Sequence, residues 1–465
     1  MWLADEETSC RSRGTWRGKT GNICLTDFAK FLTPLCERRL RVVTTKPISM
    51  NKLVVSVGII ALGGSVLHAA ETGALNAQQT EKAWSVSASL RGFYDDNFNA
   101  QPSATKQSST GLEIAPSVDF GVAGEQSSVN VGYDFTARYY EKAVSGSSDH
   151  SDFTHNFNAT ATHAFNERVR LNASEQFVIG QEPDLQRGPI DNPQRIDGDN
   201  ARNYASVGAT VQATSLLGFQ LGYNNTLVDY DDEGDGSNSA RLDRMEHGVN
   251  LSARWTLTPQ TVGIVGTRIG RTGYSRDGEF ADVGVLATDR DSRSLILYSG
   301  AEHEFNNSLS GSLLVGGQRT TYPNNPNTDS EWSPWAEASL DYQYRTQTTM
   351  SFGFSYSRTA TDMVSPLGGN FVRDTETAAV YASLKHEIMA HLSGSGTIRY
   401  QSAKFNGGSV DGNTDNFLLL GLGLAYEFNP NFEGNIGYNF DDLSSDIAGR
   451  EYTRNKFYVG VTAKY

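Results

Sequence analysis

The chain is poor in the features that define several large classes of protein. Its 465 residues include only 3 cysteines and 13 prolines, and only 38% of them are hydrophobic. The longest apolar stretch, Leu53 to Leu67, is too short for a transmembrane helix. The formal net charge is −14 and no Lys/Arg cluster occurs, which argues against a nucleic-acid partner. The sequence therefore excludes a helical membrane protein and disfavours a nucleic-acid-binding one.

Glycine and aromatic residues are plentiful instead. The chain has 46 glycines, 20 tyrosines and 22 phenylalanines, and aromatic residues make up 10% of it. That aromatic content is too high for a disordered chain, which cannot bury such side chains. The length fits two or three ordinary domains, or one large sheet that closes on itself.

Residues 50–69 have the pattern of an export signal. Met50-Asn-Lys is followed by the apolar stretch and then by small residues at Ala69-Ala70. A charged start, an apolar segment and a small-residue cleavage point define a secretory signal peptide. A buried core helix is the alternative, but three glycines within the apolar stretch make it a poor helix. We therefore expect cleavage after Ala69.

Residues 1–49 differ from the rest of the chain and contain all three cysteines. We interpret them as a mis-called N-terminal extension before a true start at Met50, and residues 70–82 as a short periplasmic segment. Residues 1–70 hold 10 of the 39 Lys and Arg residues and 5 of the 53 Asp and Glu residues, so the remainder has a net charge of −19. The expected mature chain has no cysteine and needs no disulfide framework.

From Trp84 to the last residue, apolar and polar side chains alternate in successive segments. The alternation is clearest in residues 129–139, and it recurs in 249–257, 418–428, 432–440 and 457–465. A period of two residues predicts strands with one apolar face and one polar face.

Turn residues divide these segments in a regular order. Short turns fall near 124–125, 166–167, 217–218, 259–260, 306–307, 346–347, 389–390 and 429–430. Longer polar stretches fall near 95–108, 142–151, 181–202, 231–242, 275–292, 323–331, 363–373, 406–413 and 444–453. Most prolines lie in these connections, as the strand ladder requires, and we interpret the exceptions Pro116 and Pro334 as bulges or strand ends. The order predicts 18 strands, with the alternation of short turns and long loops that is typical of an outer-membrane barrel.

The predicted fold class is therefore all-β. We expect residues 83–465 to form a closed antiparallel up-and-down transmembrane β-barrel of about 18 strands, with short periplasmic turns and long extracellular loops. A soluble sandwich or propeller is the alternative, but neither requires the second strand face to be so polar. In a membrane barrel the apolar face meets lipid and the polar face meets water in the lumen, so low hydrophobicity is compatible with insertion.

Two short motifs add a resemblance to known families. The last strand has apolar residues at alternate positions and ends on an aromatic residue, as in bacterial outer-membrane proteins: Phe457, Val459, Val461, Ala463 and Tyr465. This resemblance implies recognition by the barrel-assembly machinery, although Tyr465 replaces the more usual Phe. The segment Leu90-Arg-Gly-Phe-Tyr-Asp-Asp-Asn-Phe-Asn-Ala100 resembles the opening of the putative β-barrel porin 2 family. The resemblance implies an outer-membrane location in a Gram-negative-type bacterium.

Candidate catalytic and metal sites are weak. Asp149-His150 is the one tempting pair, but no Gly-x-Ser-x-Gly elbow accompanies it, so we expect no enzyme activity. The stretch 229–235 resembles the first half of a calcium loop, yet Ala240 and Arg241 stand where a bidentate Glu belongs. We expect a solvated acidic loop, no metal and no cofactor.

Charged residues on the polar phase of the strands are the remaining candidates for a functional site. We expect these side chains to face the lumen: Asp134, Arg138, Arg168, Arg170, Arg254, Glu302, Glu337, Asp341, Arg345, Lys385, Glu387 and Glu433. They either hydrate and cross-link the wall or set the ion preference of a pore, and the sequence leaves both roles open.

The predicted function is an outer-membrane channel for passive diffusion of small hydrophilic solutes, because barrels of 16–18 strands leave an aqueous channel unless they are plugged. The alternative is a barrel that serves exopolysaccharide export or surface assembly, for which aromatic rows should line the lumen. Tyr140, Tyr298 and Tyr381 fall on the polar phase. Expected partners are outer-membrane lipid and lipopolysaccharide, the barrel-assembly machinery and the solutes; the oligomeric state stays open. The acidic loops predict weak to moderate cation selectivity.

Overall fold

The structure of the chain is a computed structural model. It describes residues 83–465 except 144–148, 184, 186–189, 192, 194–198, 233, 235–236, 276–278, 281–284, 326–329, 346 and 366–369. The proposed extension 1–49, the signal peptide 50–69 and the segment 70–82 lie outside the described residues.

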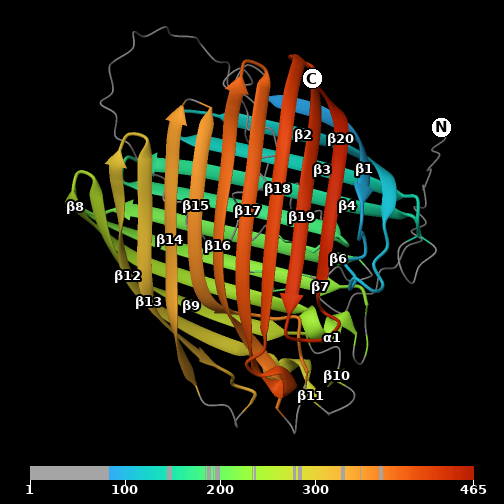
Figure 1. Cartoon of the computed structure of the whole chain (residues 1–465). Coiled ribbons are helices and arrows are strands. Elements are labelled where there is room, and N and C mark those ends of the chain that lie inside the picture. The colour runs from blue at the N-terminus through green and yellow to red at the C-terminus, as the bar shows by residue number, and fades with distance from the viewer. Residues whose placement is uncertain are drawn as a thin grey trace, which may run out of the picture. The chain divides into compact units, whose positions relative to one another are not determined.

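Eighteen long strands form one sheet (Figure 1). The first nine are β1 (Trp84–Asp95), β2 (Ser109–Ala123), β3 (Ser127–Tyr140), β4 (Ser151–Asn166), β5 (Val169–Gly180), β6 (Asn200–Gln212), β7 (Leu217–Tyr230), β8 (Arg244–Thr258) and β9 (Thr261–Tyr274). The other nine are β12 (Ser292–Asn306), β13 (Leu309–Thr321), β14 (Glu331–Arg345), β15 (Thr348–Thr359), β16 (Val372–Met389), β17 (Leu392–Gly407), β18 (Thr414–Asn429), β19 (Phe432–Ser445) and β20 (Tyr452–Lys464).

Short elements lie in the long loops. They are α1 (Asn238–Leu242), β10 (Glu279–Phe280), β11 (Val285–Leu286) and the 3₁₀ helices η4 (Ala287–Arg290) and η5 (Gly408–Val410). Among the described residues, no helix is long and apolar enough to cross a membrane.

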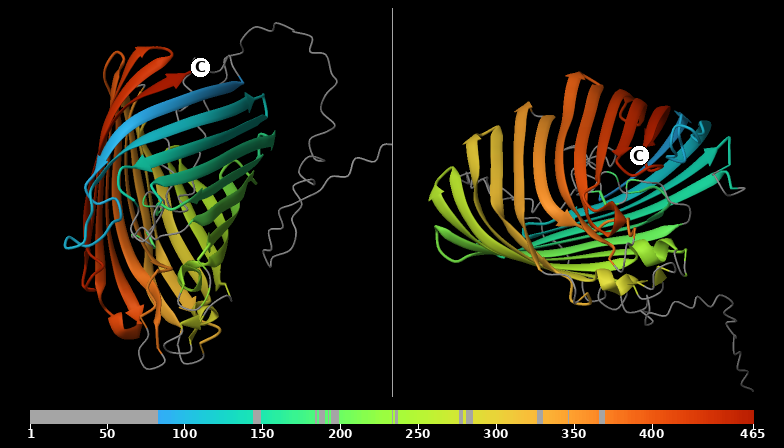
Figure 2. Two further views of the ribbon diagram at one scale, coloured as in Figure 1. Left: turned by 90° about the vertical axis from the view of Figure 1, so that its right-hand side faces the viewer. Right: turned by 60° about the horizontal axis from the view of Figure 1, so that its bottom comes forward.

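The sheet closes into a barrel because its first and last strands pair. Each long strand is antiparallel to its neighbours in chain order, and β1 pairs with β20 as well as with β2. Tight turns occur at one end of the strands and long loops at the other (Figure 2). The predicted closed barrel of 18 strands is confirmed. Closure leaves no strand edge unpaired, as hydrocarbon surroundings require.

The two strand faces differ as the alternation predicts. Along each strand, every second side chain points to the outer face, and many of these are large, apolar and exposed, for example Leu112 (57%), Val265 (65%) and Ile436 (60%). The intervening positions carry mostly polar side chains that turn inward, many of them buried among the loops. The fold thus has an apolar exterior and a polar interior, the reverse of a soluble protein.

Asparagine shapes three of the tight turns. The side-chain oxygens of Asn166, Asn306 and Asn429 accept hydrogen bonds from the backbone N–H groups two residues later, at 2.9, 2.8 and 2.9 Å respectively. An Asn side chain that imitates a backbone turn in this way favours a tight reversal. An exposed phenylalanine comes directly before each of these asparagines, where aromatic residues form the girdle at a membrane interface.

Several glycines make room for an inward-facing tyrosine on the next strand. Gly266, Gly353 and Gly437 are the direct cross-strand partners of Tyr298, Tyr381 and Tyr458. A Cβ at Gly437 would lie 2.1 Å from Cζ of Tyr458, and the other two pairs are as close. The ring therefore lies flat over the glycine backbone, which explains part of the high glycine and tyrosine content.

The two prolines within strands occupy gaps in the ladder. Pro116 pairs with Ala88 of β1, but the pairing of β2 with β3 skips Ala115 and Pro116. Pro334 pairs with Gly317 of β13, and the pairing of β14 with β15 begins two residues later, at Ala336. Each proline thus lies where one of its two neighbouring ladders is interrupted, so its missing N–H breaks no strand hydrogen bond.

The glycine–tyrosine packing predicts a selective loss of stability. Gly437→Ala should lower the free energy of unfolding by about 1–3 kcal/mol, because the new methyl group displaces the Tyr458 ring. Gly92→Ala is the control, since nothing lies within 4 Å of a Cβ there. Urea unfolding of both variants in lipid vesicles measures the difference, and equal stabilities would contradict the packing argument.

Candidate functional site

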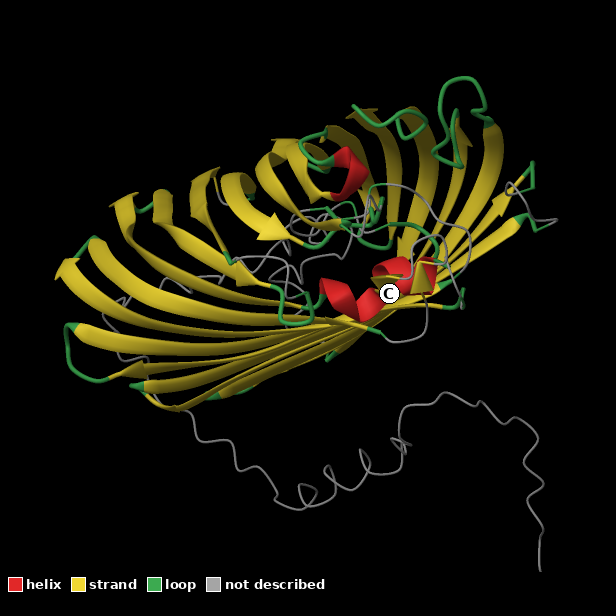
Figure 3. Ribbon diagram, turned by 90° about the horizontal axis from the view of Figure 1, so that it is seen from below, coloured by secondary structure: helices red, strands yellow, loops and turns green. Residues whose placement is uncertain are grey.

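Several loops at the long-loop end fold inward (Figure 3). Viewed from that end, the short helices and several loops lie within the ring of strands (Figure 3). Buried residues accordingly gather there, including Phe98, Ile190, Leu242 and Phe371. The candidate functional site is this inner loop assembly together with the polar wall that it contacts.

The connection between β5 and β6, residues 181–199, contacts strands that are not its neighbours. The Gln401 side chain, on β17, accepts a hydrogen bond from the Ile190 N–H and donates one to the Ile190 carbonyl, both at 2.7 Å. The Tyr452 hydroxyl, on β20, donates to the Pro193 carbonyl at 2.7 Å. Together these bonds hold the middle of the loop against β17 and β20.

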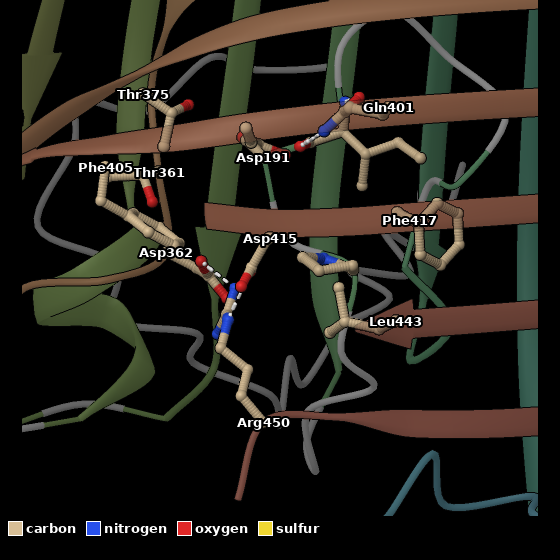
Figure 4. A pocket seen from close by; sticks show the side chains of 13 residues that line it. Asp191, Thr361, Asp362, Thr375, Gln401, Phe405, Asp415, Phe417, Leu443 and Arg450 are labelled. Carbon is tan, nitrogen blue, oxygen red and sulfur yellow. Dashed lines mark hydrogen bonds and ion pairs between the residues drawn. The ribbon is translucent and has the colours of Figure 1, made fainter. Parts of the chain in front are cut away.

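Apolar packing supports the same contact. Ile190 belongs to a buried cluster with Phe417 and Leu419 of β18, Leu443 of β19 and Tyr452. Phe417 and Leu443 also line a small pocket beside Gln401 (Figure 4). Inward positions of strands are normally polar in a membrane barrel, so these apolar residues mark where the loop covers the wall.

A buried arginine fixes the first part of the loop. Arg454 of β20 pairs with Asp95 at 2.7 Å and with Glu182 at 3.2 Å. Arg202 of β6 donates to the Glu182 carbonyl at 3.0 Å. A further arginine, Arg244 of β8, pairs with Asp191. Charge-assisted bonds therefore hold residues 182 and 191 of the loop from three different strands.

Arg450 joins the β19–β20 connection to the β15–β16 connection and to β18. It lies in the β19–β20 connection and extends between Asp362, in the β15–β16 connection, and Asp415 of β18 (Figure 4). Both separations are 2.7 Å, and all three side chains are almost fully buried. Burial raises the pKa of Asp362, and the neighbouring Arg450 guanidinium opposes that rise. The pair is thus a buried charged contact that strengthens the loop assembly only while both partners are present.

Arg290 connects three loops through backbone groups. Its guanidinium donates to the Arg241 carbonyl at 2.6 Å and to the Thr361 carbonyl at 2.5 Å. It also lies 4.2 Å from the centre of the Tyr274 ring. Burial lowers the pKa of Arg290, and Tyr274, Asp362 and Asp374 act against that shift. The β7–β8, β9–β12 and β15–β16 connections therefore meet at one side chain.

Arginines of this assembly face an excess of carboxylates. Arg244 pairs with Asp191 and also with Glu246, at 2.7 Å. Arg450 and Arg454 likewise have two carboxylate partners each. Counting these partners alone, each of the three groups has one negative charge left over. These three groups thus contribute negative charge to the outer part of the lumen, and the buried Arg290 offsets part of it.

Some of the lumen residues predicted from the sequence come together. Arg254 of β8 forms a double hydrogen bond with Glu302 of β12, one of its bonds at 2.8 Å. Arg138 of β3 contacts Glu113 at 2.8 Å and Asp152 at 3.5 Å. The remaining contacts of predicted residues are Glu337 with Arg268, Glu433 with Lys464, Asp134 with Asn156 and Asp341 with Ser351.

Other predicted residues lie apart from these pairs. Arg170, Arg345, Lys385 and Glu387 are exposed near the tight turns. Arg168 lies in the turn between β4 and β5, so it has no position on a strand face.

The two motifs with apparent chemistry lie at or in long connections between strands. Asp149 and His150 lie side by side in the β3–β4 connection, where the His150 ring contacts the Tyr140 carbonyl at 3.0 Å and stacks on Tyr139. Within the described part of the acidic stretch 229–235, and in the rest of the described chain, no group of three or more His, Cys, Asp and Glu side chains could hold a metal ion.

The arginines that organise the loops are absent from the sequence prediction. Arg244 and Arg454 occupy inward positions at the strand ends next to long loops, and Arg450 lies in a loop. The alternation along the strands shows that Arg244 and Arg454 lie on the polar face. Their carboxylate partners come from segments up to 359 residues away in the chain, so no local pattern identifies them.

One family model matches the chain. The family described as putative beta-barrel porin 2 matches residues 85–465, which include almost all of the described residues. No curated protein matches the chain.

Several solved porins are similar to the chain. OccK9 (OpdG) of Pseudomonas aeruginosa is 13% identical, with a TM-score of 0.42 over 82% of this chain and 98% of that one. The BenF-like porin of Pseudomonas fluorescens Pf-5 is 10% identical, with a TM-score of 0.42 over 83% and 99%. OccAB4 of Acinetobacter baumannii is 12% identical, with a TM-score of 0.42 over 82% and 98%. At this level of similarity, these proteins indicate nothing about the solutes of this chain.

The double hydrogen bond to Ile190 predicts that Gln401 controls the mobility of the 181–199 loop. Gln401→Leu leaves the buried N–H and carbonyl of Ile190 without partners, which costs about 1–3 kcal/mol. We expect the Ile190 amide to exchange hydrogen at least ten times faster. Gln176→Leu, which removes an inner-wall bond to Asn156 on β4, is the control. Unchanged exchange at Ile190 in Gln401→Leu would refute the anchor.

A buried carboxyl predicts pH dependence in the β7–β8 connection. Burial raises the pKa of Asp243 from 3.8 to about 7, against hydrogen bonds from Ser239 and the Tyr230 N–H that lower it. The stabilisation is complete below about pH 4 and is lost as the pH rises through 7. Trypsin should therefore cleave after Arg241 more slowly at pH 5 than at pH 8, relative to a denatured substrate.

Asp243→Asn serves as the matched variant. An amide is neutral at both pH values, and its oxygen can still accept the hydrogen bond from the Tyr230 N–H while its NH2 group donates to the Ser239 hydroxyl. The difference between pH 5 and pH 8 should disappear in this variant, and its persistence would show that another group titrates.

Proposed function

The chain belongs to the putative beta-barrel porin 2 family, and from that premise we propose that it lets small hydrophilic solutes diffuse passively across the outer membrane of a Gram-negative bacterium. The family and the closed barrel make it an outer-membrane porin channel. We propose in addition that its solutes are small and hydrophilic and that they cross by passive diffusion.

The observation that carries the proposal is the polar inner wall with an anchored inner loop. Pairs such as Arg254 with Glu302 and Arg268 with Glu337 lie on the inward face below the loop assembly. The 181–199 loop meets β17 and β20 above them. A polar wall hydrates a solute, and a loop that projects inward narrows the path that the solute takes. Both features favour selection of small hydrophilic molecules.

The polymer-guiding alternative has less support. It calls for a row of exposed aromatic rings along the lumen, as sugar-binding channels would need. Tyr140 packs against Phe98, with ring centres 5.2 Å apart. Tyr298 packs against Trp335, and Tyr381 lies over Gly353 on a separate part of the wall. These rings are packing elements of three distant strands and form no row.

The last strand carries the features by which we expect the barrel to be recognised during assembly. Phe457, Val459 and Val461 are exposed on the outer face, and Tyr465 continues the pairing with β1 through two backbone hydrogen bonds to Val86, at 2.9 and 3.2 Å. This exposure supports recognition by the barrel-assembly machinery, and we propose that export with a cleaved signal peptide at 50–69 precedes it.

Liposome swelling tests the proposed diffusion. Proteoliposomes should admit small neutral sugars and amino acids at rates that fall steeply with solute size. The Gln401→Leu variant should admit larger solutes faster, because its inner loop is freed. Exclusion of every small solute by both proteins would overturn the proposal.

The acidic outer lumen predicts weak to moderate cation selectivity. A lining of one sign concentrates counter-ions, and the effect fades at high salt because the Debye length falls from about 10 Å at 0.1 M to about 3 Å at 1 M. Reversal potentials in a KCl gradient should therefore favour K⁺, most strongly in dilute salt. Glu302→Gln frees the charge of Arg254 and should lower the selectivity, whereas Arg254→Gln should raise it. Clear anion selectivity of the native protein would contradict the charge argument.

A further inference from the structure

Three exposed arginines form a patch on the outer face of the barrel. They are Arg271 of β9, Arg293 of β12 and Arg319 of β13. On their strands they share the alternate phase of the exposed apolar residues Ile269 (56%) and Leu297 (50%). Their side chains therefore point away from the lumen.

Strand register brings the three side chains together. β9, β12 and β13 pair in that order. Arg271 and Arg293 are direct cross-strand partners, and Arg319 pairs with Leu295, two residues from Arg293. Direct partners on one face have Cβ atoms about 4.5–5.5 Å apart, and diagonal neighbours lie within about 7–8 Å. One ligand can therefore contact all three guanidinium groups.

The patch lies at the long-loop end of the membrane-spanning strands. Arg293 is the second residue of β12, while Arg271 and Arg319 lie three and two residues before the ends of their strands. Trp332 of β14 is the register partner of Arg319 and is 59% exposed. Because tryptophan favours the membrane–water interface, it marks the level of the outer-leaflet headgroups.

These arginines differ from the inner ones in their surroundings. Among the described residues, no carboxylate lies within 4.0 Å of their guanidinium groups, and Arg319 donates to the Ser330 hydroxyl at 3.0 Å. The inner Arg244, by contrast, has two carboxylate partners. Like charges directly opposite each other in a sheet destabilise it. A patch of this kind is therefore favourable only when an anion neutralises it.

We propose that Arg271, Arg293 and Arg319 bind the phosphate groups of a phosphorylated glycolipid of the outer leaflet, the lipid A part of lipopolysaccharide. A guanidinium group matches phosphate with two parallel hydrogen bonds. Exposed apolar residues on the same strands continue below the patch, among them Ile269, Leu297 and Val315. The phosphates of one lipid can thus contact the arginines while its acyl chains contact the apolar residues nearer the middle of the membrane.

The first test uses the sign of a stability change. In phosphatidylcholine vesicles Arg293→Gln should raise the unfolding temperature, because it relieves the repulsion with Arg271. In vesicles that also contain diphosphoryl lipid A the same variant should lower it. Arg345→Gln, at the opposite end of the barrel, should change neither value. A shift of the same sign in both vesicles would overturn the proposal.

The second test measures binding to the purified full-length protein in detergent. Native mass spectrometry should show diphosphoryl lipid A bound at least ten times more weakly by R271Q/R293Q/R319Q than by the native chain. R168Q/R170Q/R345Q, with three exposed arginines replaced near the tight turns, should bind like the native chain. Heat-dependent migration on gels verifies that both variants are folded.

Competition distinguishes the glycolipid from phosphate in general. Millimolar inorganic phosphate should displace little lipid A, and a dephosphorylated lipid A should bind weakly. Equal affinity of the native chain and R271Q/R293Q/R319Q, or full displacement by inorganic phosphate, would refute the glycolipid site. Conductance is not measured in these tests, so their outcome is independent of the proposed solute diffusion.

Discussion

The pairing of every backbone N–H and carbonyl within hydrocarbon is the constraint on which the rest of this structure depends. A sheet satisfies it only when β1 and β20 meet. Closure in turn divides the side chains into an outer set facing lipid and an inner set facing water. The low hydrophobicity of the chain follows from this division, and Pro116 and Pro334 are confined to two local interruptions of the ladder.

The polar interior creates a second requirement, since a wide ring of strands leaves space that the loops occupy. Loops that enter it carry backbone groups that must be paired as well. Gln401 pairs with Ile190, and Arg290 pairs with two loop carbonyls, for this reason. Arginine suits the role because its planar group makes several bonds at once and stays charged when buried.

The strand count, the order of turns and loops, and the polar phase of the wall could be predicted because each depends on local patterns of two to fifteen residues. Asn166 and Asn429, for example, mark their turns by side-chain chemistry alone. The inward course of the 181–199 loop could not be predicted. Its anchors Tyr452 and Arg454 are separated from it by more than 250 residues, and loop composition does not distinguish a solvated loop from one fixed within the lumen. Arg168 shows the same limit, because a shift of the turn by one residue removes it from the strand face.

The 181–199 loop also has a mechanical consequence. A ring held by hydrogen bonds between neighbours resists stretching along its circumference but can still be flattened. Ile190 of this loop is bonded to β17 and its neighbour Asp191 to Arg244 of β8, so these two residues act as a strut across the ring. Lateral pressure from the membrane that would deform the outer end must first break the bonds of Gln401 and Arg244. The cross-section there is therefore stiffer than at the tight-turn end, which has no strut among the described residues.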